Sequence, residues 1–138
     1  MLILLASCGG DDGSGLSVDE FRAQVNAICA KYRQRLEALG GTRSPDELQT
    51  YVEKALPIAE EWTAEFEKVE PPSQFQDDWN RLMELQHQGV AKTEELQDAL
   101  RDKDTARIQA AFAGADATAN EADRLAARLG LSECAGDG

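Results

Sequence analysis

The chain is poor in the residue types on which many catalytic and metal sites depend. Its 138 residues include a single histidine, His87. A di-iron helical bundle uses two Glu-x-x-His pairs, so the one pair here, Glu84 and His87, cannot complete such a site. The same histidine would be the only possible base of a Ser-His-Asp or Cys-His site, and no recognisable nucleophile motif lies near it. We therefore predict no catalytic residue, no metal site and no cofactor.

Basic clusters and the loop motifs that bind phosphate or calcium are also missing. The 26 acidic residues outnumber 14 basic ones, and the net charge of −12 argues against a nucleic-acid partner and against adhesion to anionic lipids. The glycine pairs at 9–10 and 40–41 lack the preceding strand of a phosphate-binding loop. No calcium-loop pattern surrounds the acidic run between residues 60 and 70, and we interpret this run as a solvated helix face. This run comprises Glu60, Glu61, Glu65, Glu67 and Glu70.

The first fifteen residues carry the most informative pattern. An apolar run ends in Leu5-Ala6-Ser7-Cys8, and a Gly-, Asp- and Ser-rich spacer follows, which is typical of a bacterial lipoprotein processing site with Cys8 as the lipidated residue. The seven residues before Cys8 are too few for a spanning helix, which needs about 20. We expect a truncated lipoprotein signal at residues 1–7, a flexible tether at 8–16 and one domain at 17–138. A secretory signal remnant and a disordered cytosolic N-terminus are the alternatives.

The sequence has three cysteines, and no Cys-x-x-Cys motif of a redox-active pair. If Cys8 carries lipid, Cys29 and Cys134 remain as a possible disulfide, which an oxidising compartment would favour. The alternative is two unrelated buried thiols in a reduced protein. Cys29 is expected beside the apolar face of its helix and not in its middle, so that an extended segment from Gly130 would have to reach back to it.

Two helices are predicted before the Pro71-Pro72 pair. Ser17 and Glu20 form a capping box for the first helix, which Gly40-Gly41 ends. Ser44 caps the second, and Pro57 should kink it near Ala55. Apolar residues recur at three- and four-residue steps on one face of each helix. These are Val18, Phe21, Val25, Ile28, Tyr32, Leu36 and Leu39 in the first, and Leu48, Val52, Leu56, Ala59, Trp62, Phe66 and Val69 in the second.

Two further helices are predicted after Pro72. Ser73 is the expected cap of the third, the turn at 102–104 separates it from the fourth, and Gly130 with Leu131 should end the fourth in a Schellman cap. The third has the weaker face, because Gln86, Gly89 and Thr93 occupy positions where apolar residues are expected. The predicted faces are Phe75, Trp79, Leu82, Met83, Val90, Leu96 and Leu100, then Ile108, Phe112, Ala115, Ala119, Ala122, Ala126 and Leu129.

Four amphipathic helices with short connections predict an all-α, up-down-up-down four-helix bundle with a kinked second helix. In this fold most aromatic side chains are expected in the core. The functional alternative is a ligand cleft between the second and third helices, near Pro57, with Trp62, Trp79 and Gln86 as ligand-binding residues.

Three short motifs connect this chain with a wider group. They are Asn26-Ala27-Ile28-Cys29, Pro71-Pro72, and Leu129-Gly130-Leu131 followed by Cys134. In these motifs the chain resembles small actinobacterial lipoproteins and secreted helical proteins of unassigned function, over residues 17–134. The resemblance implies the helical bundle and the Cys29–Cys134 disulfide more strongly than spacing does, and it implies no catalytic or binding residue.

The combined expectation is a non-enzymatic, lipid-anchored helical protein on the outer face of the cytoplasmic membrane. It would be a monomer held by acyl chains on Cys8 and would contact an envelope protein. The alternative function is binding of a small amphipathic ligand in the cleft described above.

Overall fold

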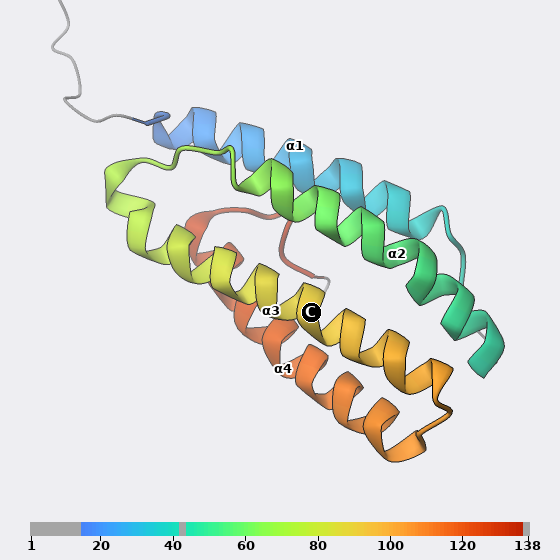
Figure 1. Cartoon of the computed structure of the whole chain (residues 1–138). Helices are drawn as coiled ribbons and strands as arrows, with labels where there is room; N and C mark the ends of the chain where they lie inside the picture. Colours follow the sequence, from blue (N-terminus) through green and yellow to red (C-terminus); the bar gives the residue numbers. More distant parts are fainter. Residues whose placement is uncertain (1–14, 42–43, 137–138) are drawn as a thin grey trace, which may run out of the picture.

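The computed structural model describes residues 15–41 and 44–136, and every regular element in this part of the chain is helical. The α-helices are α1 (Val18–Glu37), α2 (Pro45–Phe66), α3 (Gln76–Arg101) and α4 (Thr105–Leu129), with a 3-10 turn, η1 (Ser73–Phe75), before α3. They run alternately up and down, and consecutive helices pack on one another (Figure 1). The predicted all-α bundle is confirmed.

Different helix ends and connections lie at the two ends of the bundle. The start of α1, the α2–α3 connection and the end of α4 lie together at what we call the near end (Figure 1). The α1–α2 connection and the 102–104 turn between α3 and α4 lie at the opposite, far end (Figure 1).

Ser17 and Ser44 cap the first two helices as predicted. Each hydroxyl accepts a hydrogen bond from the backbone N–H three residues later, and the carboxylates of Glu20 and Glu47 accept from the backbone N–H of the caps. These reciprocal bonds satisfy N–H groups that the first helical turn leaves without a partner. The local sequence therefore sets where both helices begin.

The end of α4 also follows the prediction. Gly130 adopts the left-handed conformation, with φ 76° and ψ 27°. Its N–H donates to the carbonyl of Ala127, and the N–H of Leu131 donates to the carbonyl of Ala126, which completes the Schellman arrangement. Leu131 folds back into the core and is fully buried.

The predicted Ser73 cap of the third helix is wrong. Ser73 begins η1, and α3 starts at Gln76 with no side-chain cap. Pro71 and Pro72 are both buried, and Pro72 holds an extended conformation with φ −54° and ψ 147°. The turn η1 is needed to redirect the chain from this extended segment into α3, so the helix begins later than the serine predicts.

The core consists of two clusters along the bundle axis. The cluster toward the near end contains residues from all four helices, and its buried members are Phe21, Val25, Cys29, Phe66, Val69, Trp79, Leu82, Leu85, Leu125, Ala126, Leu129 and Leu131. The cluster toward the far end draws only on α2, α3 and α4, with Val52, Leu96, Leu100 and Ala111 buried. Between Leu85 and Leu96, the half-buried Gln86, Gly89 and Thr93 separate the two on α3, as the interrupted apolar pattern indicates.

Pro57 lies on the solvent side of α2, which continues through it without a break. The ribbon changes direction in the middle of the helix, in agreement with the predicted kink (Figure 1). A proline lacks the N–H that would bond to the carbonyl four residues earlier, here that of the exposed Glu53. The buried face differs locally from the prediction, because Ala55 and Ile58 are buried while Leu56 is half-buried.

Two residues have surroundings that the sequence pattern did not predict. Cys29 is not beside the apolar face but within it, at 0% exposure, because α1 buries Phe21, Val25, Cys29 and Tyr32 in one row. Phe112 was expected in the core, yet it is 42% exposed. The far-end cluster that α4 joins there has no member from α1, so no fourth helix covers this side chain.

The C-terminal tail, residues 131–136, closes the side of the bundle between α1 and α4. In Figure 1 the tail passes between the layer of α1 and α2 and the layer of α3 and α4. The Cys29–Cys134 disulfide links it to α1, with 5.1 Å between the two Cα atoms. The tail reaches α1 through a tight turn rather than as the extended segment we expected, since the N–H groups of Cys134 and Ala135 both donate to the carbonyl of Leu131.

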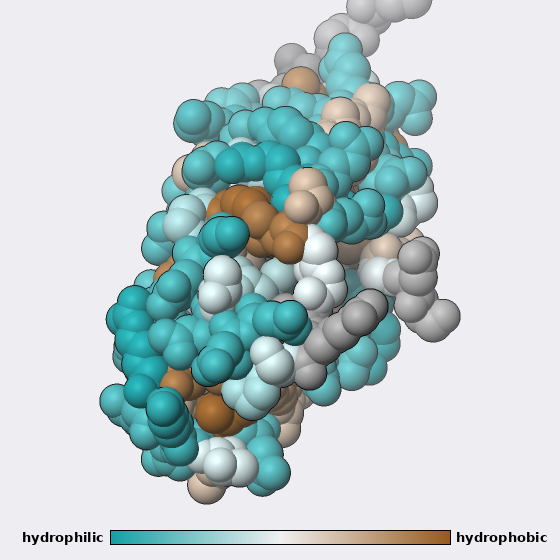
Figure 2. All heavy atoms as spheres, turned by 90° about the vertical axis from the view of Figure 1, so that its right-hand side faces the viewer, coloured by the Kyte–Doolittle hydropathy of each residue, from teal (hydrophilic) through white to brown (hydrophobic). Residues whose placement is uncertain are grey.

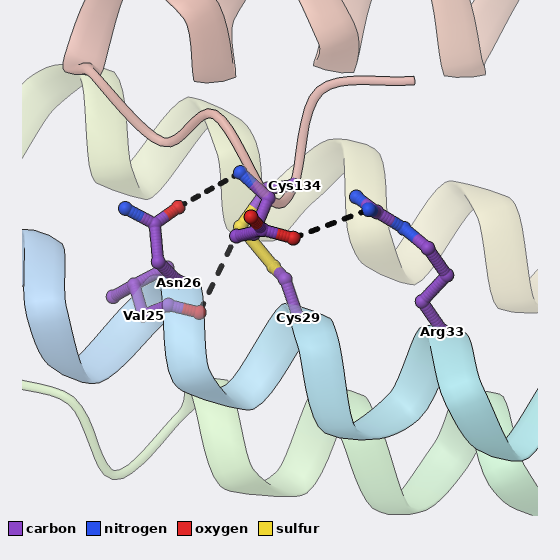
Figure 3. Close-up of a disulfide and its surroundings, with 6 residues drawn as sticks. Val25, Asn26, Cys29, Arg33 and Cys134 are labelled. Carbon is purple, nitrogen blue, oxygen red and sulfur yellow. Dashed lines mark hydrogen bonds and ion pairs between the residues drawn. A yellow bond between two sulfur atoms is a disulfide. The ribbon is translucent and has the colours of Figure 1, made fainter. Parts of the chain in front are cut away.

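Polar contacts fix the tail on both sides of the bridge (Figure 3). The Asn26 side-chain oxygen accepts a hydrogen bond from the backbone N–H of Glu133 at 3.0 Å. The Glu133 carboxylate pairs with Arg33 at 3.3 Å. Nearby, Arg22 donates to the carbonyl of Leu129 at 2.9 Å, so the end of α4 is bound to α1 directly.

Reduction of the disulfide should destabilise the domain strongly. The bridge closes a loop of 105 residues, and the chain-entropy model gives about 4–5 kcal/mol for a loop of that size. We expect the unfolding midpoint of the Cys29→Ser/Cys134→Ser variant to lie lower by roughly 10 °C or more, measured by circular dichroism. Adding reductant to the wild type should give the same shift, and reductant should leave the variant unchanged. Equal midpoints for wild type and variant would contradict a stabilising bridge.

Candidate functional site

The two tryptophans predicted to bind ligand belong to a continuous row of aromatic rings. Each ring lies 5.2–5.8 Å, between centroids, from the next. The order is Phe75, Phe21, Trp79, Phe66, Trp62 and Tyr32. Edge-to-face and stacked pairs of this kind add about 0.5–1.5 kcal/mol each beyond their burial. The row joins α1, α2, η1 and α3 into one unit.

Within this row Trp79 and Trp62 have different surroundings. Trp79 is 3% exposed, and the rings of Phe21 and Phe66 cover it. Trp62 is half-buried and stacks on Tyr32 with an interplanar angle of 7°. Its buried indole N–H has no hydrogen-bond partner among the described residues. Gln86 is half-buried on α3. Phe66 thus lies between the two tryptophans and contacts the ring of each. Ligand binding by Trp62, Trp79 and Gln86 stays a prediction.

Charged side chains of α1 and α2 surround Tyr32. Lys31 forms an ion pair with Glu65, and Arg35 pairs with Glu61 at 2.5 Å. Lys31 Nζ and the Arg35 guanidinium also lie 4.6 and 5.2 Å from the centroid of the Tyr32 ring. The hydrogen bond to Glu65 raises the pKa of Lys31, and the same bond lowers the pKa of Glu65. Burial raises the pKa of the Tyr32 hydroxyl.

One further member of the acidic run, Glu67, and the two residues of the Glu-x-x-His pair also form ion pairs. Glu67 lies 3.1 Å from His87 Nε2, across from α2 to α3. Glu84 instead pairs with Arg81, at 2.6 Å, and Arg81 also binds Glu121 of α4. In the part of the chain that the structure describes, no three His, Cys, Asp or Glu side chains come together as a metal site.

A pocket of about 680 Å³ lies at the far end, where α2 begins, α3 ends and α4 begins. Leu48, Leu100 and Ile108 supply its apolar side, and all three belong to or pack on the far-end core cluster. Ser44, Asp46, Gln49, Lys103 and Thr105 are the polar lining residues. Ligand sites in proteins have about this size and the same mixture of an apolar lining with a few polar groups.

Lys103 lies at the rim of this far-end pocket in an unusual conformation. Its φ of 54° is the only positive one of a non-glycine residue in the described ranges. The turn fixes its backbone, since the Lys103 N–H donates to the carbonyl of Leu100. Its ammonium group forms no ion pair with a described residue. Figure 2 shows the surface on this side, where small apolar areas lie within a mostly hydrophilic surface.

The sequence reasoning missed this pocket, because its lining comes from two distant stretches of the chain, 44–49 and 100–108. A comparison with protein-family models, with curated proteins and with solved structures found no match. None of the described helices has the length and apolar character needed to cross a membrane.

The ion pair of Glu65 should make stability depend on pH in the acid range. Because the folded-state pKa of Glu65 is lowered, its contribution is fully present above the unfolded pKa of about 4.3 and is lost as the pH falls through the folded value. We expect Glu65→Gln to lower the unfolding midpoint at neutral pH and to lose less stability than the wild type between about pH 5 and 3. Thermal unfolding at several pH values measures this.

The matched control for this prediction is Glu94→Gln. Glu94 is an exposed carboxylate of α3 without an ion pair to a described residue. Parallel pH profiles for the Glu65 and Glu94 variants would show that the Lys31–Glu65 pair does not couple to folding.

Proposed function

We propose that this chain is a lipid-anchored helical domain that works outside the cytoplasm and acts by contact with an envelope protein, without catalysis. The observation that carries the proposal is the Cys29–Cys134 disulfide, whose Cys29 side is fully buried. Disulfides form and persist in oxidising compartments and are rare in the cytosol. A domain whose tail is held by such a bridge is therefore suited to an exported protein.

The anchor in this proposal is the Leu5-Ala6-Ser7-Cys8 pattern, which lies outside the described residues. Two or more acyl chains anchor a protein stably, whereas one chain gives only marginal binding. The net charge of −12 would not by itself attract the domain to an anionic membrane. Membrane attachment therefore depends on Cys8 in this account.

A role in binding agrees with the stiffness of the domain. The row of six rings and the bridged tail hold α1, α2, α3 and the end of α4 in one arrangement. A surface that is already ordered loses less conformational entropy when a partner binds. The partner in this proposal is a protein, because a net charge of −12 disfavours binding to the phosphates of a nucleic acid.

The anchor is tested by metabolic labelling with a fatty acid in the native host. The wild type should incorporate label and fractionate with the membrane, whereas Cys8→Ala should do neither, because the thiol that forms the thioether is missing. Ser7→Ala is the matched control, since it keeps a small residue beside Cys8 and should still be labelled. An unlabelled wild type, or equal label on Cys8→Ala, would refute the lipid anchor.

A second candidate function is the binding of a small amphipathic ligand. The far-end pocket favours it, because an apolar side formed by Leu48, Leu100 and Ile108 meets a polar rim that includes the exposed Lys103. This location differs from the cleft near Trp62 and Trp79 that the sequence suggested. The ligand would place its apolar part against the three aliphatic side chains and its polar part at the rim.

Native mass spectrometry of protein purified from its own membrane tests this second function. We expect a retained mass beyond that of the acylated chain in the wild type, and its loss in Ile108→Trp, where the indole fills the pocket. Ala91→Trp adds the same group at an exposed site of α3 outside the pocket and should keep the mass. A wild type that carries no additional mass would count against the ligand.

A further inference from the structure

The structure fixes the point at which the proposed tether meets the domain. The backbone N–H of Leu16 donates to the carbonyl of Glu70 at 3.2 Å, and the Leu16 side chain packs against the near-end core cluster. Gly15 lies so close to the α2–α3 connection that an added Cβ would come within 2.6 Å of the Pro71 carbonyl oxygen. The chain therefore enters the domain at a defined place on the near end.

Simple lengths relate this place to the membrane. Six residues lie between Cys8 and Gly15, so the seven steps from one Cα atom to the next can span about 25 Å at most. The 26 residues of α3 make the bundle about 39 Å long between its two ends. The far end could therefore touch the membrane only if the bundle lay flat on it, or if the tether were almost fully extended and the bundle tilted down toward the lipid.

The charges along the bundle oppose that flat arrangement. Exposed carboxylates lie along the sides of α2, α3 and α4, and they include Glu53, Glu60, Glu94 and Asp116. Near an anionic lipid surface, like charges repel strongly within a Debye length of about 8 Å. A flat bundle would bring a whole side into this range, whereas an upright bundle exposes only the near end to it.

We infer that the near end faces the membrane and that the far end, with its pocket, points away from it. This inference rests on the proposed lipid anchor at Cys8. It makes the far end the surface that meets the proposed envelope protein: the start of α2 at 44–46, the turn at 102–104 and the start of α4. The pocket would then open about 39 Å farther from the lipid than the residue where the tether enters.

Energy transfer to a membrane dye tests the orientation in the acylated protein. The protein is reconstituted in vesicles of phosphatidylglycerol and phosphatidylcholine that carry an acceptor dye on the headgroup. A donor dye is attached through p-azidophenylalanine, which avoids the cysteines, at one of three exposed residues: Gln74, Gln88 or Arg101. These positions follow one another from the near end to the far end, and Gln88 serves as the internal control.

Transfer should fall in the order Gln74, Gln88, Arg101, with at least about a twofold difference between the two ends for a separation of about 39 Å. Equal transfer at the three positions would show a flat bundle and overturn the orientation while leaving the anchor intact. Greater transfer at Arg101 would overturn it as well. A chain whose intact mass lacks acyl groups on Cys8 would overturn the anchor itself, and the orientation with it.

Discussion

The connection between the C-terminal tail and α1 is the constraint on which the rest of this structure depends. Helices α1 to α4 pack in sequence order, and the tail with its Cys29–Cys134 bridge closes the remaining side. Leu131 and Cys29 are both fully buried there, and the half-buried Cys134 packs against the near-end core from its edge. Loss of the bridge would free the tail and uncover apolar side chains of α1.

The same constraint divides the molecule into two parts with different character. Near the bridge, four helices and the tail share one core, and the row of aromatic rings runs through it. Toward the far end only α2, α3 and α4 form the core, and Phe112 is left exposed. The tether of the proposed anchor enters at the tightly packed near end, and the pocket lies at the far end. This arrangement agrees with a protein that is attached to the membrane at one end and binds its partner at the other.

The sequence predicted those features of the fold that local chemistry determines. The capping boxes at Ser17 and Ser44 and the Schellman turn at Gly130 each depend on a few adjacent residues, and all three are confirmed. The burial of Cys29 was missed because the apolar pattern placed Ile28 on the buried face. In α1 the buried residues after Phe21 follow at spacings of four, four and three residues, so that Cys29 and not Ile28 lies at the centre of the face. The position at which α3 starts depends on the extended segment of the two buried prolines, Pro71 and Pro72, that precedes η1. The presence of a possible capping residue at Ser73 does not predict this segment.

The candidate site was less predictable, for a physical reason. The far-end pocket forms where the ends of three helices meet. Its lining residues come from two stretches, 44–49 and 100–108, which lie more than 50 positions apart in the sequence. No local motif marks such a place, and the core beside it contains residues of α2, α3 and α4 but none of α1. The aromatic residues, in contrast, mostly lie where apolar periodicity places them, and they pack against each other.

The state of the two core cysteines in living cells tests the central claim most directly. Intact cells are treated with a membrane-permeant alkylating agent before lysis, and the chain is digested and mapped by mass spectrometry without reduction. The account predicts one linked peptide pair that contains Cys29 and Cys134, with no alkyl group on either residue. Alkylated Cys29 and Cys134 in unlinked peptides would show a reduced protein, and would contradict both the closing role of the bridge and the exported location.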